Sequence, residues 1–180
     1  MNFIQKYNLT RQLSRFVKRK KREEVQVCSL EQAKSVCILH SFESQEFMQQ
    51  IIKLGSSLEK NKKNVAFFCY LPKEKEFLAS NHERVGVISE KDFDFKGCLR
   101  KEKSVSLQKQ SFDILLDLDK TKDSLSALYL AVAVNAKFRI GRCENVKKYY
   151  NVILYSSNES CTLEEYFQSV DKYTKKIVRQ

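Results

Sequence analysis

The residue types best suited to chemistry stand at the ends of apolar runs. His40 follows the run VCIL, and Asp117 and Asp119 end the run FDILLDLD. If these runs are neighbouring strands of a parallel sheet, their carboxyl ends meet at one edge, where ligands of open α/β sheets bind. A histidine beside a carboxylate can act as acid and base. The candidate ligand pocket comprises His40, Asp117, Asp119 and Arg142.

A structural interpretation of the same residues is favoured over catalysis. His40 can cap a strand end, and the aspartates can cap the next helix. No GxGxxG or GxxxxGK[ST] occurs, and the turn HSFES contains no glycine, so an ordinary nucleotide or flavin enzyme is not expected. Two histidines and no closely paired cysteines argue against a metal site. We therefore expect no cofactor, no metal and no catalytic residue.

The first 22 residues offer a different chemistry, because they hold eight Lys or Arg and no acid. The formal net charge is +11, so the rest of the chain carries only the remaining +3. Apolar residues recur among the basic ones, as in an amphipathic helix. Such an arm predicts a polyanionic partner, either nucleic acid or an anionic membrane surface, and the alternative is a solvated helix that merely packs on the domain. The basic residues are Lys6, Arg11, Arg15, Lys18, Arg19, Lys20, Lys21 and Arg22.

Basic and aromatic residues alternate in this arm, which favours RNA. No helix-turn-helix, zinc-finger or RNA-recognition signature is visible, so structured RNA fits better than specific duplex DNA. A second basic cluster either extends the surface or is ordinary solvated charge; it comprises Lys137, Arg139, Arg142, Lys147 and Lys148. We expect phosphate contacts from Arg11, Arg15, Lys18, Arg19, Lys20, Lys21 and Arg22, and stacking or docking from Phe3, Tyr7 and Phe16.

The elements that must position these residues alternate between strands and helices. Residues 112–142 read as strand, helix, strand, beginning with an apolar run typical of a strand buried on both faces. Other strands are predicted at 36–39, 65–71, 85–88 and 150–155. Helices are predicted after Ser44, near 76–79, within 99–110 and from Thr162. The alternation predicts an open, mostly parallel, Rossmann-like or flavodoxin-like sheet of five or six strands with helices on both faces.

Length and composition indicate a basic helical arm over residues 1–25 and a single α/β domain over 26–180. The six cysteines form no CxxC pair, and we expect free, mostly buried thiols. The first 22 residues lack the apolar core of a secretory signal, and no run approaches the roughly 18 apolar residues of a membrane span. A cytoplasmic location is expected.

The chain resembles two known families, one over a short stretch and one over its whole length. The stretch FDILLDLD followed by SALYLAVAVNAKFRIGR resembles the N-terminal half of heptosyltransferase-type glycosyltransferases, over residues 112–142. The whole chain is similar to a family of small uncharacterised proteins from Bacteroidota, through its basic N-terminal run, LEQAKSVCIL, FDILLDLD and AKFRIGR. The first resemblance implies the α/β fold, and the second implies a bacterial cytoplasm.

The leading hypothesis is a non-catalytic RNA-binding protein associated with the ribosome, with ribosomal RNA and ribosomal proteins as partners. One alternative is a degenerate glycosyltransferase-like domain that binds a small molecule or catalyses at the strand ends. The other is a peripheral membrane protein held by the basic arm.

Overall fold

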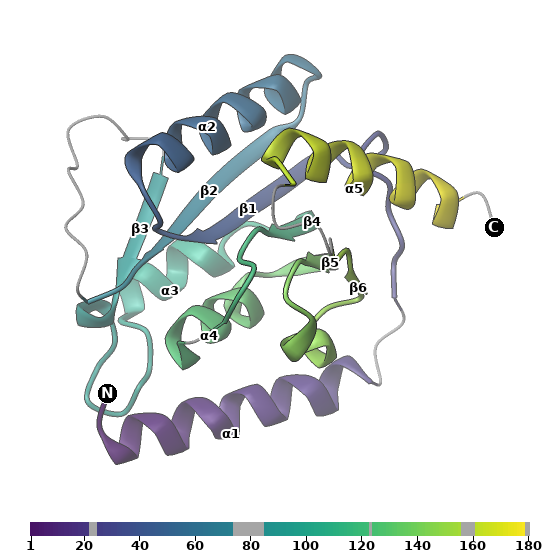
Figure 1. The fold of residues 1–180 in the computed structure, drawn as a ribbon. Coiled ribbons are helices and arrows are strands. Elements are labelled where there is room, and N and C mark those ends of the chain that lie inside the picture. The colour runs from purple at the N-terminus through teal and green to yellow at the C-terminus, as the bar shows by residue number, and fades with distance from the viewer. Residues whose placement is uncertain (22–24, 74–84, 123, 156–160, 179–180) are drawn as a thin grey trace.

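A computed structural model describes residues 1–21, 25–73, 85–122, 124–155 and 161–178. Within these residues, six strands form one sheet in which every pairing is parallel (Figure 1). The predicted open parallel α/β sheet is therefore confirmed. The strands are β1 (Ser35–Ser41), β2 (Asn64–Leu71), β3 (Val85–Ser89), β4 (Phe112–Asp117), β5 (Ala136–Gly141) and β6 (Val152–Ile153).

The strand order is β3-β2-β1-β4-β5-β6. This is the doubly wound order of the Rossmann fold and differs from the flavodoxin order. The progression of strands along the sheet reverses between β1 and β4, so the ends of these two strands form the topological switch point. Ligands of open α/β sheets bind beyond the carboxyl ends of the strands at such a point.

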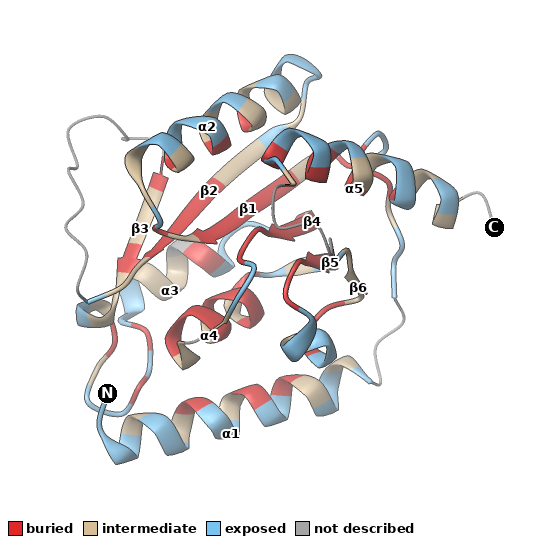
Figure 2. Ribbon diagram, in the orientation of Figure 1, coloured by how far each residue is buried: buried red, intermediate tan, exposed pale blue. Residues whose placement is uncertain are grey.

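Helices cover both faces of the sheet (Figure 1). α2 and α5 pack on one face, whereas α3, α4 and α1 lie on the other. α4 is buried almost all round, because it lies between the sheet and α1 (Figure 2). The helices are α1 (Phe3–Lys20), α2 (Gln45–Lys60), α3 (Lys101–Gln108), α4 (Leu125–Ala133) and α5 (Leu163–Val178), with short 3₁₀ turns η2 (Glu90–Asp92) and η3 (Glu144–Tyr149).

The last predicted strand is shorter than expected. It was predicted over 150–155, and the structure confines it to β6 at the sheet edge. Asn151 N and Leu154 N donate to Arg139 O and Gly141 O, so pairing with β5 spans only this short segment. The short helix predicted near 76–79 lies outside the described residues. The helix predicted from Thr162 is confirmed, because Thr162 and Glu165 exchange side-chain and backbone hydrogen bonds at its start.

Candidate functional site

The basic N-terminal segment forms α1, which is closed at its start by a capping box. Asn2 Oδ1 accepts from Gln5 N at 2.8 Å, and Gln5 Oε1 accepts from Asn2 N at 2.9 Å. The last turn carries Lys18, Arg19 and Lys20, whose charges complement the negative end of the helix dipole. Local sequence therefore specifies both ends of this helix.

α1 packs lengthwise against α4 and η3 instead of projecting from the domain (Figure 1). Leu9, Leu13 and Phe16 recur at helical spacing and are all buried in the same core as the strands. Burial of this stripe turns the opposite, charged face outward (Figure 2). The side chains exposed on that face include Lys6, Arg11, Arg15, Lys18, Arg19 and Lys21. Arg22 lies outside the described residues.

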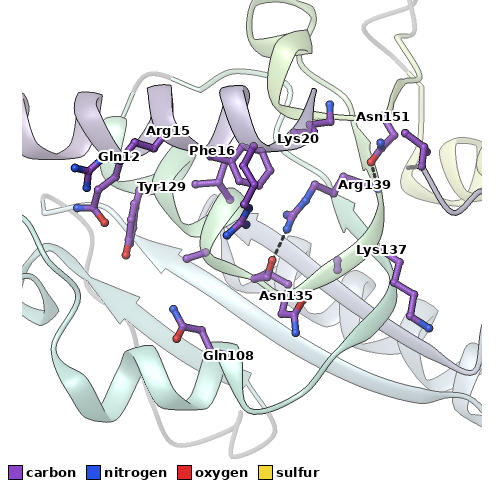
Figure 3. Close-up of a pocket in the computed structure, with 16 residues that line it drawn as sticks. Gln12, Arg15, Phe16, Lys20, Gln108, Tyr129, Asn135, Lys137, Arg139 and Asn151 are labelled. Carbon is purple, nitrogen blue, oxygen red and sulfur yellow. Dashed lines mark hydrogen bonds between the residues drawn. The ribbon is translucent and has the colours of Figure 1, made fainter. Parts of the chain in front are cut away.

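A cavity of about 750 Å³ opens between α1 and the segment that joins α4 to β5 (Figure 3). We call it the α1 cavity. Among the described residues, no Asp or Glu lines it. One of its cations, Lys137, pairs with Asp113 at 3.0 Å outside this wall, and the other cations leave an excess of positive charge. The cations that line it are Arg15, Arg19, Lys20, Lys137 and Arg139.

Arg139 is a structural cation at the back of this cavity. Its guanidinium donates to the carbonyl oxygens of Ala131 and Val134, at the end of α4, and lies 5.0 Å from the centre of the Phe16 ring. It thus caps the negative end of α4 and holds α1 through a cation–π contact. Phe16 is 8% exposed and belongs to the core on this side of the sheet.

Lys20 lines the α1 cavity near the end of α1. Its Nζ donates to Tyr150 O and, at 3.5 Å, to Lys148 O, which ties α1 to η3. Burial lowers the pKa of Lys20, and the nearby charge of Arg139 lowers it further. Lys20 and Arg139 thus place two positive charges near each other beside the α1 cavity.

The structure brings most of the second basic cluster to α1. Lys137 and Arg139 line the α1 cavity, and Lys147 and Lys148 are exposed on η3, which contacts α1. Arg142 does not join them. It lies 4.7 Å from the centre of the Tyr166 ring and donates to Cys161 O, so it anchors α5 on the other face of the sheet.

Phe3 and Tyr7 lie on the exposed side of the first turns of α1. Their side chains are 83% and 59% exposed. Nearby, Gln5 Nε2 and Asn8 Nδ2 donate to Asp94 O and Lys96 O, which fixes the start of α1 to the loop after η2. The two aromatic rings are therefore presented to solvent from an anchored helix.

The strand-end aspartates meet a lysine that sequence reasoning missed. Lys122 Nζ lies 2.9 Å from Asp117 Oδ2 and 2.5 Å from Asp119 Oδ2, and all three side chains are buried. Tyr150 Oη donates to Asp117 Oδ2 at 2.5 Å. Ser41 N and Oγ donate to Asp119 at 2.5 and 2.7 Å. We call Asp117, Asp119, Lys122 and Tyr150 the strand-end cluster.

Burial and charge act against each other on the pKa values of this cluster. Burial raises the pKa of Asp117, opposed by the ammonium group of Lys122. Burial would lower the pKa of Lys122, but the charges of Asp117 and Asp119 outweigh it, and this pKa is raised. The pKa of Tyr150 is raised by burial and by Asp117. The arrangement holds the ammonium group of Lys122 between the carboxyl groups of Asp117 and Asp119.

His40 does not face Asp117, although β1 and β4 are neighbours, whereas Asp119 lies near enough to act on the His40 pKa. Successive side chains of a strand alternate between faces, and His40 follows Val36 and Ile38 toward α2. Its ring meets Phe47 edge-on, with centroids 6.0 Å apart. Its Nδ1 lies 3.0 Å from Ser41 O, and its buried Nε2 has no hydrogen-bond partner among the described residues. Asp117 instead faces Tyr150 on the opposite side.

A smaller cavity of about 410 Å³ lies beside the strand-end cluster, at the switch point of the sheet. Its wall includes the hydroxyl groups of Ser41, Tyr70 and Ser124. Ser124 Oγ donates to Tyr70 Oη at 3.1 Å, and Tyr70 Oη donates to Glu90 Oε1 at 3.2 Å. Of the four residues predicted for a pocket, only Asp119 lines this cavity. No sequence pattern marks Tyr70 or Lys122 as part of it.

Among the described residues, no group of three or more His, Cys, Asp or Glu is placed to hold a metal ion. Nor does any helix in the described part of the chain have the length and apolarity needed to span a membrane.

The family described as "Family of unknown function (DUF6913)" matches residues 2–177, which include both α1 and nearly all of α5. No curated protein sequence matches the chain.

Proposed function

Since the chain belongs to the DUF6913 family, whose function is unknown, we propose from the geometry that it is a non-catalytic RNA-binding protein. The observation that supports this most is a broad cationic surface, formed by the outward face of α1, the α1 cavity, and Lys147 and Lys148 of η3. Arg and Lys side chains on such a surface contact phosphates and release counterions.

The spacing of the outward cations suits a phosphate backbone. Arg11, Arg15 and Lys18 recur at intervals of four and three residues, which advance about 6 Å and about 4.5 Å along the axis. The helix is held rigidly against α4 and η3, so these side chains are arrayed before RNA arrives. Pre-organisation of this kind reduces the entropy lost on binding.

The same geometry favours RNA over a membrane surface. An amphipathic membrane helix inserts its apolar stripe between lipids. In α1 that stripe consists of Leu9, Leu13 and Phe16, which are buried in the protein core. The large apolar side chains of α1 that remain exposed for lipid contact are Phe3, Ile4 and Tyr7, at the start of the helix and away from the dense basic end.

The proposal is tested by replacing three exposed cations of α1 together, R11Q/R15Q/K18Q. We expect weaker binding to a structured RNA, and a slope of log K against log salt that is smaller by about 2. The matched control is K53Q/K60Q/K172Q, which removes the same charge from α2 and α5 on the opposite side. Equal affinities for the two triple variants would contradict the proposal, and so would binding of anionic vesicles in preference to RNA.

Ribosomal RNA is the abundant structured RNA of cells, so ribosome association is the setting we propose. Sedimentation of lysates at low and high salt tests it. The wild-type protein should migrate with ribosomal particles at low salt and be released at high salt. R11Q/R15Q/K18Q should stay at the top of the gradient. Wild-type protein that stays at the top, with no enriched RNA, would rule out this setting.

The 410 Å³ cavity supports a second candidate, a small-molecule site at the strand ends. The local resemblance of residues 112–142 to glycosyltransferases makes nucleotide sugars the first probes. Such a ligand should raise the melting temperature of the wild-type protein and of R11Q/R15Q/K18Q, but should raise that of a Lys73→Gln variant less, because the cavity then loses a cation. Equal stabilisation of all three proteins would place the ligand elsewhere.

A further inference from the structure

We infer that the α1 cavity receives an unpaired nucleotide of the bound RNA, so that the protein prefers single-stranded segments to continuous duplex. This inference rests on the proposed RNA-binding function and names the RNA feature that the site selects. Three features of the cavity support it: its size, its carboxamide groups and its aromatic wall.

The cavity has the size and place that an inserted nucleotide needs. Its volume of about 750 Å³ lies within the roughly 300–1,000 Å³ typical of small-ligand pockets. Its wall includes Arg15 and Arg19 of α1, cations proposed to hold the phosphate backbone. A backbone tracking along α1 would thus pass the mouth of the cavity.

Four carboxamide side chains line the cavity, from four different segments (Figure 3). A carboxamide offers both donors and acceptors, which suits the edges of unpaired bases. Asn151 Oδ1 accepts from Arg139 N at 2.8 Å, so the group that Asn151 can present to a ligand is its NH₂. The four residues are Gln12 of α1, Gln108 of α3, Asn135 before β5 and Asn151 before β6.

An aromatic ring supplies a stacking surface in the same wall. Tyr129 of α4 lines the cavity beside Gln12 (Figure 3) and is only half-buried. Its ring packs edge-on against Phe93, with centroids 5.9 Å apart, which holds its orientation. Burial raises the pKa of the Tyr129 phenol, so the group stays neutral. A fixed neutral ring can stack on any base, which gives affinity without strict sequence preference.

Duplex RNA cannot use these groups. Its base edges are paired and its bases are stacked on one another, so only its phosphates would reach α1. Phosphate contacts alone should therefore give weaker binding to duplex than to single strands. Stacking of one base on an aromatic side chain typically contributes enough to raise affinity by about tenfold or more.

The test compares a short single-stranded RNA with the same strand annealed to its complement, at equal salt. The wild-type protein should bind the single strand about tenfold more tightly. A cavity variant, Q12A/Q108A/N135A, should lose this preference while keeping the wild-type salt slope, because its α1 cations are intact. R11Q/R15Q/K18Q should lose affinity for both forms. Melting temperatures check that each variant is folded.

A fluorescent base analogue, 2-aminopurine, gives a second readout within the single strand. Its emission should be quenched by stacking when the wild-type protein binds and quenched less by Tyr129→Leu, which keeps the apolar bulk. Free mononucleotide in large excess should compete only weakly, because it lacks the neighbouring phosphates that α1 would hold.

The outcomes separate this inference from the function on which it rests. If neither form of RNA binds, the proposed function fails and the inference with it. If both forms bind equally, and Q12A/Q108A/N135A changes nothing, RNA binding stands and the nucleotide pocket is refuted. Full competition by free mononucleotide would also refute it, in favour of a site for small soluble nucleotides.

Discussion

Lys122 is the residue on which the strand-end cluster depends. Its ammonium group is shared by Asp117 and Asp119, and its side chain is 1% exposed. This cation lies between the two buried carboxylates, which also accept hydrogen bonds from Tyr150 and Ser41. Its removal would leave two like charges unpaired in a medium of low polarity.

We therefore expect Lys122→Met to lower the free energy of unfolding by about 3 kcal/mol or more. Lys137→Met is the control, because the Lys137–Asp113 pair, at 3.0 Å, has a lysine that is 50% exposed. That change should cost less than about 1 kcal/mol. Urea denaturation measures both values, and similar costs for the two variants would contradict a buried, stabilising ion pair.

His40 predicts a pH dependence of stability. Burial lowers its pKa below the ordinary value of 6.5, against smaller opposing effects of Ser41 O and Asp119. As the pH falls below about 6.5, the unfolded chain takes up a proton that the folded chain does not. Stability is thus lost toward acid, by at most about 1.4 kcal/mol per pH unit.

The measurement compares wild-type protein with His40→Leu in urea, from neutral pH down to mildly acidic pH. Because the pKa of Asp117 is raised above its ordinary value of 3.8, Asp117 makes the protein more stable as the pH falls toward that value. This contribution is present in both proteins. The free energy of unfolding of His40→Leu should therefore rise relative to that of the wild-type protein as the pH falls. A difference that does not change with pH would mean that the pKa of His40 is the same in the folded and unfolded states.

At the scale of elements, helices are fitted to the sheet at defined points of close approach. α2 crosses β2 at Gly55, which is buried, and a Cβ placed on Gly55 would overlap the ring of Phe67. Phe67 is itself buried in β2, so the ring has little room to move. The absence of a side chain at Gly55 sets how closely α2 approaches the sheet.

Gly55→Ala should therefore destabilise the protein by about 1–3 kcal/mol, despite the better helix propensity of alanine. Ser56→Ala, one position along the same helix, should stay within about 0.5 kcal/mol of wild type. Thermal or urea unfolding measures both. A stabilising effect of Gly55→Ala would show that Phe67 can move aside.

At the scale of the whole molecule, the two sides of the sheet carry different surfaces. α1 presents its cations on one side, whereas α2 and α5 cover the other (Figure 1). The cysteines are distributed through the same architecture as six free thiols. Cys37, Cys69 and Cys143 are buried, Cys28 and Cys161 are half-buried, and Cys98 is exposed.

Alkylation of the native protein should follow this burial. Cys98 should react first, because it is exposed, and Cys37, Cys69 and Cys143 only after unfolding. Burial also raises the pKa values of Cys37 and Cys69, which suppresses their reactive thiolate forms. Peptide mapping by mass spectrometry reads out the order. Labelling of Cys37 as fast as Cys98 in native protein would contradict the described core.

The sequence by itself determined the features that depend on neighbouring residues. The apolar run of β4 and the helical spacing after it identified a parallel α/β sheet, because periodicity is a local property. The absence of acids from the first 22 residues marked α1 as basic. The spacing of Leu9, Leu13 and Phe16 already contained the stripe by which α1 docks.

Only the tertiary structure decided which distant residues meet. His40 and Asp117 follow neighbouring strands, yet strand alternation and register turn them to opposite faces. Lys122 and Tyr150 reach Asp117 from separate loops, and the α1 cavity draws its wall from α1, α3, α4 and β5. These contacts join residues that are far apart in the chain. They depend on the strand order and on how the helices pack, and local sequence patterns do not encode either.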